Sequence, residues 1–184
     1  MDNFPKTLTL TRRSGEAQEF LLRQCDESDL YEIVRLQWKI YDAVDDPGIY
    51  ALVEDDDILE SLKEDYCFGV YLDNKLVAFT MMIANRVSDR NYGSYIGYTP
   101  EQQQHCVSME ITIVDEPCRG YGLQKVFVEL REGIARELGA TESFVTIGPE
   151  NEYSLRNLQA AGYEIIETRT LYEGAQRHIL RKYL

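Results

Sequence analysis

An arginine and two glycines directly precede a segment with helical periodicity, and this arrangement suits the binding of an anion. Arg119, Gly120 and Gly122 follow a run of β-branched residues and lead into the apolar repeat of residues 123–138. The first N–H groups of a helix have no partner within the helix, and the aligned peptide dipoles make that end partly positive. Glycines let an anion approach the backbone, and an arginine adds a full charge. The pattern predicts a phosphate site, although the glycines alone are equally typical of a tight turn.

Two common nucleotide-binding motifs do not match this loop. A P-loop requires a lysine and then a serine or threonine directly after its last glycine, where this chain has Leu123 and Gln124. The dinucleotide-binding motif requires a third glycine three residues after Gly122, where this chain has Lys125. The phosphate ligand is therefore expected to be of another kind.

The composition indicates one globular domain with an acidic surface. A chain of 184 residues that is 44% hydrophobic is long enough for one sizeable core, so we expect a single domain over residues 1–184. A formal net charge of -13 disfavours broad binding to nucleic acids or to anionic membrane surfaces, because both require clustered Lys and Arg. A cationic partner is easier to accommodate.

Cysteine usage and the absence of an apolar span favour a cytoplasmic protein. No leader-like start and no segment of membrane-spanning length is present in the sequence. His105 and His178 do not suggest a metal site with each other, and no metal is expected. Four scattered cysteines without a CxxC pair are expected to be free thiols in a reducing compartment: Cys25, Cys67, Cys106 and Cys118.

The first half of the chain shows one short strand followed by two helices. Residues 19–24 are a strand candidate, and Asp26 or Ser28 is placed to cap the helix that follows. Pro47 and Gly48 interrupt that pattern, and a shorter helix begins near residue 56. The apolar face of the first helix is expected to contain Leu30, Ile33, Val34, Trp38 and Tyr41.

The second half alternates strands and helices. Asp73 and Asn74 suit a tight turn between the apolar runs 67–72 and 76–84, which predicts a hairpin. A strand at 106–114 and a helix at 123–138 ending before Gly139 come next. A strand at 142–148, a short helix at 151–161 and two final strands complete the order. We predict the α/β class, with a mixed, mostly antiparallel sheet flanked by helices.

A long polar and aromatic segment, residues 85–105, shows no clean period. Loops of this length in a compact domain are usually functional or disordered, and the tyrosines disfavour disorder. We interpret the segment, with Tyr92, Tyr95 and Tyr98, as a candidate wall of a substrate site. An irregular surface excursion is the alternative.

The loop sequence VDEPCRGYGLQ, residues 114–124, resembles the acyl-CoA pyrophosphate loop of the GNAT superfamily of N-acetyltransferases. That loop has Arg or Gln, two residues, Gly, one residue, and then Gly or Ala. Arg119 and Gly122 stand at the first two of these positions, while Gln124 departs from the usual final residue. Because the phosphate contacts in this family are made largely by backbone N–H groups, binding remains compatible with glutamine. The resemblance implies that the coenzyme contacts Arg119, Gly120, Tyr121, Gly122, Leu123 and Gln124.

A second stretch is similar to the other GNAT signature, an Asn, two residues, Ser or Ala, and a Gly-aromatic pair that ends a helix. Residues 151–163 place Asn151 and Ser154 at the matching positions, and the resemblance assigns both to the coenzyme site. The order of elements is that of the GNAT fold. The final residues, 172–184, also look like the tail of a bacterial GNAT subgroup that tends to share the Gly-Leu-Gln variant.

The resemblance implies that an amine attacks the thioester of acetyl-CoA. Backbone N–H groups at Ile113 and Val114 would donate to the carbonyl oxygen, and Glu110 is the best candidate for the general base. Alternation within the strand is expected to place Glu110 on one face with Thr112 and Val114. Flanking apolar residues can raise its pKa, which suits a base. A surface glutamate at a strand edge is held equally open.

The general acid is missing from the pattern. Many GNAT enzymes carry a tyrosine four residues before the helix-closing glycine, where this chain has Leu158. Tyr153 and Tyr163 are expected to be packing residues. The leading hypothesis is an acetyl-CoA-dependent N-acetyltransferase acting on a primary amine of a small molecule or peptide. A non-catalytic acyl-CoA-binding sensor or scaffold is the alternative, and a phosphate-binding protein unrelated to CoA is a third.

The acceptor and the oligomeric state are less constrained. An acidic surface and clustered tyrosines fit a cationic or aromatic amine, because tyrosine faces attract cations. A homodimer is one option that a single sequence leaves open.

Overall fold

The computed structural model describes residues 4–44 and 49–184, and its strands form one sheet. The order across the sheet is β1-β2-β3-β4-β5-β6-β8-β7. Every neighbouring pair is antiparallel except β5 and β6, which run parallel, so the predicted fold class is confirmed. The strands are β1 Lys6–Thr11, β2 Ala17–Gln24, β3 Tyr66–Leu72, β4 Lys75–Ile83, β5 Cys106–Val114, β6 Glu142–Ile147, β7 Glu164–Leu171 and β8 Ala175–Tyr183.

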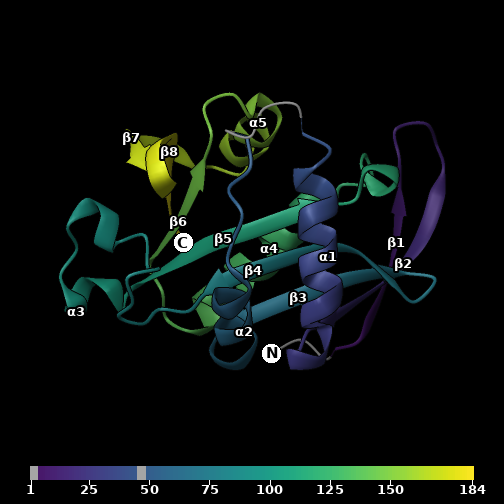
Figure 1. Cartoon of the computed structure of the whole chain (residues 1–184), viewed down its shortest axis with the longest axis horizontal. Coiled ribbons are helices and arrows are strands. Elements are labelled where there is room, and N and C mark those ends of the chain that lie inside the picture. The colour runs from purple at the N-terminus through teal and green to yellow at the C-terminus, as the bar shows by residue number, and fades with distance from the viewer. Residues whose placement is uncertain (1–3, 45–48) are drawn as a thin grey trace.

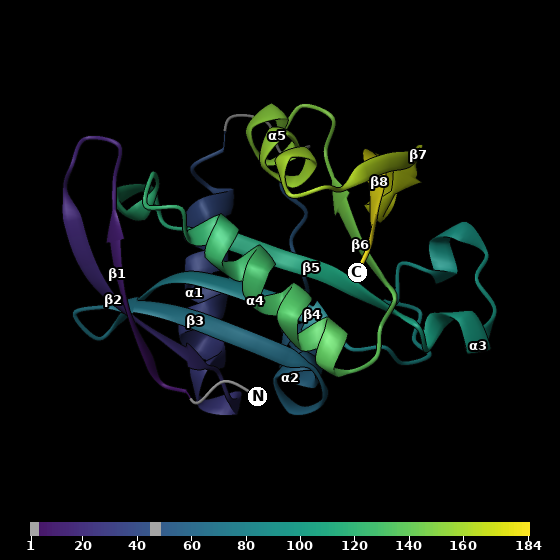
Figure 2. The same cartoon turned by 180° about the vertical axis from the view of Figure 1, so that it is seen from behind.

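Helices cover both faces of the sheet. Figure 1 shows α1 and α2 in front of β3, β4 and β5, and Figure 2 shows α4 crossing the opposite face. Each face has its own cluster of buried apolar side chains, so the sheet is the middle layer of a three-layer arrangement. None of the described helices is long and apolar enough to cross a bilayer. The α-helices are α1 Leu30–Tyr41, α2 Asp55–Glu64, α3 Pro100–Gln103, α4 Leu123–Glu137 and α5 Glu152–Ala160.

The edge strand β1 was not predicted from the sequence. It pairs with β2 in an antiparallel register that joins Thr9 to Glu19. Only Leu8 and Leu10 of this strand pack against the core, and both are partly exposed. A polar edge strand with one weakly apolar face carries little period-two signal, so its pairing with β2 decides its conformation.

The start and the buried face of α1 also differ from the prediction. The Asp26 side chain accepts from the Ser28 N–H in a capping box that belongs to a preceding 3-10 turn, and α1 therefore begins at Leu30. Its buried apolar residues are Ile33, Leu36 and Ile40. Trp38, predicted to face the core, is 47% exposed. The proposed break at Pro47 and Gly48 lies outside the described residues.

Two turn predictions are confirmed by backbone angles. Asp73 and Asn74 have φ values of 49° and 61°, as a two-residue turn between β3 and β4 requires. Gly139 follows the last turn of α4 with φ of 77°. A left-handed residue at this position ends a helix, and glycine adopts that conformation without steric strain.

We expect Gly139→Ala to lower the free energy of unfolding by about 1 kcal/mol, because a Cβ atom disfavours the left-handed conformation. Space is not the cause, since no atom lies within 4 Å of the added Cβ. Gly133→Ala, inside α4 and equally unobstructed, is the control. It should instead raise stability by up to about 1 kcal/mol through helix propensity. Urea denaturation measures the free energy of unfolding of both variants. Equal changes of the same sign would contradict the assignment of Gly139 as the left-handed residue that ends α4.

The strands β5 and β6 diverge halfway along their length. Their parallel pairing runs from Cys106 opposite Glu142 to Met109 opposite Val145 and stops there. Beyond that point, β5 continues to Val114 beside β4, while β6 continues to Ile147 beside β8. The second half of β5 thus has one edge without a strand partner. Peptide groups along that edge are available to a ligand.

A β-bulge lies at the point of divergence. The pairing of β4 with β5 shifts between Met81, opposite Ile111, and Met82, opposite Met109, which leaves Glu110 as the extra residue. Arg131 of α4, 2% exposed, donates from Nη1 to the carbonyl oxygens of Met81 and Ile111 at 3.1 and 3.2 Å. Burial lowers the pKa of Arg131 to about 10. The arginine supplies partners to carbonyl groups at the irregular ladder.

Candidate active site

The loop before α4 has the backbone conformation that an anion site requires. Gly120 and Gly122 have φ values of 87° and 80°, and Gly122 is the N-cap of α4. Both lie in the left-handed region that glycine favours. The first turn of α4 carries no acidic residue and contains Lys125. Free N–H groups and a partly positive helix end therefore meet no repelling carboxylate on this turn.

This loop opens into a cavity of about 850 Å³. Its walls come from β5, the loop, α4 and α5, so the structure brings together segments that are distant in the sequence. All the predicted coenzyme-site residues except Tyr121 line it: Ile113, Val114, Arg119, Gly120, Gly122, Leu123, Gln124, Asn151 and Ser154. The cavity also runs along the free edge of β5.

Side chains join α4 to α5 beside this cavity. The Asn157 Nδ2 group donates to Gln124 Oε1 at 2.7 Å. The side chain of Asn151 caps α5 by accepting from the Ser154 N–H at 3.2 Å. Gln124, unusual for the resembling loop, thus has a structural partner on the neighbouring helix.

The side chain of Tyr121 points away from the cavity. Its ring lies 5.2 Å from the ring of Phe20, and the Arg12 guanidinium lies 4.4 Å from its centre. Only the backbone of Tyr121 is therefore placed to serve the loop. Arg12 also donates to the Arg119 carbonyl at 3.2 Å and to the carbonyl of Pro117. Sequence reasoning missed Arg12 because it precedes the loop by more than a hundred residues and belongs to no local motif.

A second cavity, of about 120 Å³, adjoins the first. Residues that line both include Thr112, Gln124 and Ser154. It lies where β5 and β6 diverge, and its floor includes Met109 and Val145, the last paired residues. Ionisable side chains from six segments line it: Tyr50, Tyr92, Glu110, Arg131, Tyr172 and Arg177.

Glu110 enters this second cavity from the bulge. The prediction that it shares a face with Thr112 and Val114 is wrong, because the extra residue at the bulge breaks strict alternation. Its partner Arg90 also donates to the Asp57 carbonyl of α2 and contacts Met81, whose cluster includes Ile111 and Ile113. Glu110 therefore lies on the face covered by α1 and α2.

Burial and one cation set the protonation of Glu110. Its side chain is 12% exposed, and Arg90 forms a two-pronged contact through Nη2 to Oε2 and Nε to Oε1, the latter at 3.4 Å. Burial raises the pKa of Glu110, and the hydrogen bond and charge of Arg90 partly oppose this rise. The residue is thus a largely buried carboxylate beside a cavity rather than a surface glutamate at a strand edge.

Among the tyrosines of residues 85–105, only Tyr92 lines the second cavity. Tyr95 stacks on Tyr92 at 5.3 Å between ring centres. Tyr98 donates to Glu142 at 2.9 Å and packs edge-on against Phe144. The segment supplies one wall residue, Tyr92, together with the Arg90 partner of Glu110.

Leu158 stands where the resemblance predicts a tyrosine. Its side chain is 5% exposed and lines the second cavity. Tyr163 is buried and shares a 2.8 Å hydrogen bond with Ser143, which agrees with its predicted packing role. The same prediction for Tyr153 is wrong, since Tyr153 is 71% exposed at the rim of the larger cavity. Tyr172 was not singled out from the sequence as a site residue, because the resemblance of residues 172–184 assigns no role to it.

The cysteines and the possible metal ligands are separate side chains spread over the described residues. All four cysteines are free, as predicted, and all four are buried. Burial raises the pKa of Cys118, so it is not an activated thiol. Within residues 4–44 and 49–184, no group of three or more His, Cys, Asp or Glu side chains is placed to hold a metal ion.

Solved structures with the same fold include several acetyltransferases. A GNAT-family acetyltransferase from Streptococcus pneumoniae aligns with a TM-score of 0.68 at 14% identity, covering 90% of this chain and 99% of that one. PaiA N-acetyltransferase from Thermoplasma acidophilum, solved with coenzyme A, aligns with a TM-score of 0.65 at 15% identity. The alignment covers 91% of this chain and 100% of that one. YncA from Salmonella typhimurium, solved with its cofactor acetyl-CoA, aligns with a TM-score of 0.67 at 13% identity. The alignment covers 91% of this chain and 95% of that one.

Sequence comparison with curated proteins finds no significant match. The model of the acetyltransferase (GNAT) family, in contrast, matches residues 29–163, which include α4 with its glycine loop and the whole of α5. The chain belongs to the GNAT acetyltransferase family.

Proposed function

We propose that this protein transfers an acetyl group from acetyl-CoA to a primary amine of a small molecule or peptide. The observation that carries the proposal is the continuity of two cavities. One begins at the glycine loop of α4, and the other contains the buried carboxylate of Glu110. Family membership supports acyl-CoA dependence, as do the structural relatives solved with acetyl-CoA or coenzyme A.

The larger cavity fits an extended coenzyme with a diphosphate. Backbone N–H groups of Gly120 to Gln124 would bind the diphosphate at the start of α4, with Arg119 adding its charge. The free edge of β5 would pair with the pantetheine arm in the manner of an added strand. The N–H groups of Ile113 and Val114 would then lie near the thioester carbonyl.

Glu110 would act as the general base. Its carboxylate accepts a proton from the acceptor ammonium, directly or through one water. The neutral amine nitrogen then forms a bond to the thioester carbon, the carbon–sulfur bond breaks, and the nitrogen loses its second proton to water as the amide forms. The thiolate of coenzyme A leaves and takes a proton from water, since Leu158 has none to give. A leaving group with a thiol-like pKa tolerates this route.

A non-catalytic acyl-CoA-binding module is the second candidate. The buried, apolar Leu158 at the wall of the acceptor cavity favours it, because a side chain that can protonate the leaving thiolate is absent from that position. The two functions share the coenzyme site and differ only in turnover.

Calorimetry with acetyl-CoA, together with an assay for thiol release across a panel of amines, separates these functions. The transferase predicts micromolar-range binding and release of coenzyme A that depends on an amine, within the usual span of enzyme constants of about 1 μM to 1 mM. Binding without release for any amine would select the module. Absence of binding would reject both.

The acceptor, domain and compartment follow as parts of the same proposal. Tyrosine rings in the second cavity suit a cationic or aromatic amine. One sheet shared by the described segments supports a single domain over residues 1–184. Four buried free thiols fit a cytoplasmic location.

A further inference from the structure

Arg177 of β8 is a buried cation with unused hydrogen-bonding capacity. It is 4% exposed and lines the second cavity. The only hydrogen bond of its side chain to the described residues is a long one, 3.5 Å from Nη1 to the Ile49 carbonyl. Its Nε atom is buried and has no hydrogen-bond partner there. An unpaired buried guanidinium is unfavourable unless a ligand supplies the missing acceptor.

The shortage of a carboxylate at Arg177 contrasts with the rest of the chain. The protein has 32 Asp and Glu against 19 Lys and Arg, so acidic partners are abundant. Arg86 and Arg90, for example, each contact a buried or half-buried carboxylate. Arg177 forms no ion pair with any carboxylate of residues 4–44 and 49–184. The closest aromatic partner is Tyr172, whose ring centre lies 5.6 Å from the guanidinium carbon.

Charges around the second cavity are unequal. Glu110 is paired with Arg90, and Arg131 donates to backbone carbonyls at the bulge. Tyr172 also lines the cavity, with its hydroxyl 2.9 Å from Thr146 Oγ1. Among the described residues, Glu110 is thus paired with a cation, whereas Arg177 has no ion-pair partner and interacts with Glu150 only through the electrostatic field. An anion at Arg177 would complete the pairing.

We propose that Arg177 binds a carboxylate carried by a reactant in the second cavity, so that the acceptor is an amine that also bears an acid group, as an amino acid does. This inference rests on the proposed acetyl transfer. A zwitterion offers a partner to both groups, because its amino group can face the Glu110 carboxylate while its carboxylate faces the Arg177 guanidinium. A guanidinium can receive a carboxylate through two parallel hydrogen bonds. The same carboxylate can be carried instead by the acyl chain of a dicarboxylic acyl-CoA.

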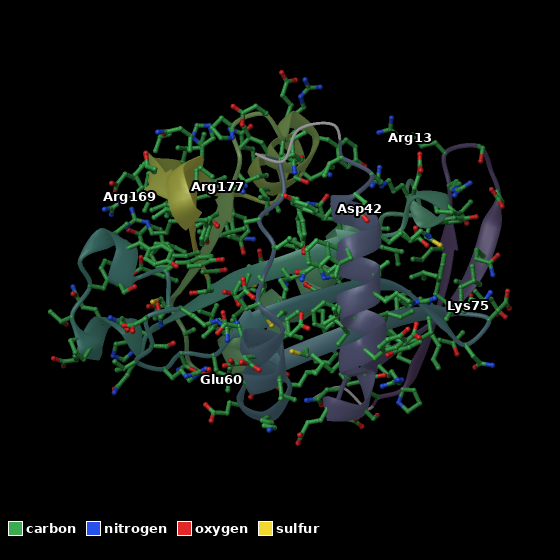
Figure 3. All side chains as sticks on the ribbon, viewed as in Figure 1. Arg13, Asp42, Glu60, Lys75, Arg169 and Arg177 are labelled. Atoms are coloured by element: carbon green, nitrogen blue, oxygen red, sulfur yellow. The ribbon has the colours of Figure 1, made fainter. Side chains whose placement is uncertain are left out.

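Figure 3 shows Arg177 and its neighbour Arg169 beside the two C-terminal strands. Arg169 lies opposite Arg177 in the pairing of β7 with β8, but its side chain is 43% exposed and contacts Glu167 at 3.7 Å. The pair provides a matched test, since removal of either charge alters the same pair of strands, β7 and β8. Of these two arginines, only Arg177 lines the cavity.

The experiment measures kcat/KM with acetyl-CoA for amino acids, each compared with its carboxamide and its decarboxylated amine. A second arm compares succinyl-CoA with butyryl-CoA at a fixed uncharged amine. We expect at least about a tenfold preference for the carboxylated member in one arm, from the strength of a charge-assisted hydrogen bond. Arg177→Met should abolish that preference through KM, Arg177→Lys should restore part of it, and Arg169→Met should retain it.

Binding data keep this inference separate from the proposed function. Calorimetry of the coenzyme A complex with the carboxylated amine and with its carboxamide needs no turnover. Selective binding without turnover would reject the transferase and keep the carboxylate site. Equal turnover of carboxylated and uncharged reactants in both arms by the unmodified protein would overturn the carboxylate site and keep the transferase. This second outcome does not depend on whether any variant folds.

Discussion

Glu110→Gln should lower kcat/KM for acetyl transfer by about 10²–10⁴-fold, the usual contribution of a positioned general base. Glutamine retains the shape of the side chain and one acceptor for Arg90, but it cannot accept the ammonium proton. Affinity for acetyl-CoA should be unchanged, since Glu110 lines the acceptor cavity and not the larger one. Steady-state kinetics and calorimetry on the same preparations measure the two quantities.

The dependence of kcat/KM on pH tests whether Glu110 is the general base. Only the ionised carboxylate is a base, so activity is lost as the pH falls through the pKa of Glu110. Burial raises that pKa, and the acid limb of kcat/KM should therefore lie above the pH expected for an exposed glutamate. Glu110→Gln should lose this limb. Glu19→Gln, on the exposed face of β2, should preserve both the rate and the limb.

Arg90 offers an independent check on the same group. Its charge opposes the rise in the pKa of Glu110. Arg90→Met should therefore move the acid limb to still higher pH, with the plateau rate at high pH less affected. An acid limb at the same pH in Arg90→Met and in the unmodified protein would remove Glu110 from the catalytic step.

Gly122→Asp should weaken acetyl-CoA binding by about 100-fold relative to Gly122→Asn, because it places a carboxylate against the diphosphate. Asp and Asn have nearly the same shape, and both tolerate the left-handed conformation that Gly122 adopts. The Asn variant measures the effect of an added side chain, and the difference between the two isolates the charge. No neighbouring atom lies within 4 Å of the added Cβ, so neither variant is blocked sterically inside the protein.

Stability provides the control for this pair. Aspartate at the N-cap of a helix normally stabilises it, since the side chain accepts from free N–H groups near the positive end of the dipole. Gly122→Asp should therefore bind the coenzyme worse and unfold no more easily than Gly122→Asn. Equal dissociation constants for the two variants, measured by calorimetry, would place the diphosphate away from the start of α4.

Local features of the sequence predicted most of the fold. The hairpin at Asp73 and Asn74, the strand that became β5, and α4 with Gly139 at its end all depend on residues close together in the chain. Hydrophobic periodicity, turn residues and helix-capping residues depend only on neighbouring positions in the chain. They can therefore be recognised in a single sequence. The glycine loop and the Asn151 signature likewise identified the family from contiguous residues.

Long-range pairing decided what local patterns could not. β1 gained its conformation from β2, and the bulge between β4 and β5 turned Glu110 to the face opposite Thr112. A shift of one residue in register moves a side chain across the sheet, and nothing in the strand's own sequence marks where it occurs.

The sequence by itself determined the family and the mixed sheet, and it predicted an anion site at the start of α4. The tertiary structure alone decided that Arg12 contacts the glycine loop, that Arg90 pairs with Glu110, and that Arg177 lines the second cavity. The physical reason is distance along the chain. Each of these side chains acts on residues brought near it by strand order and helix packing, which depend on the burial of both faces of the sheet together.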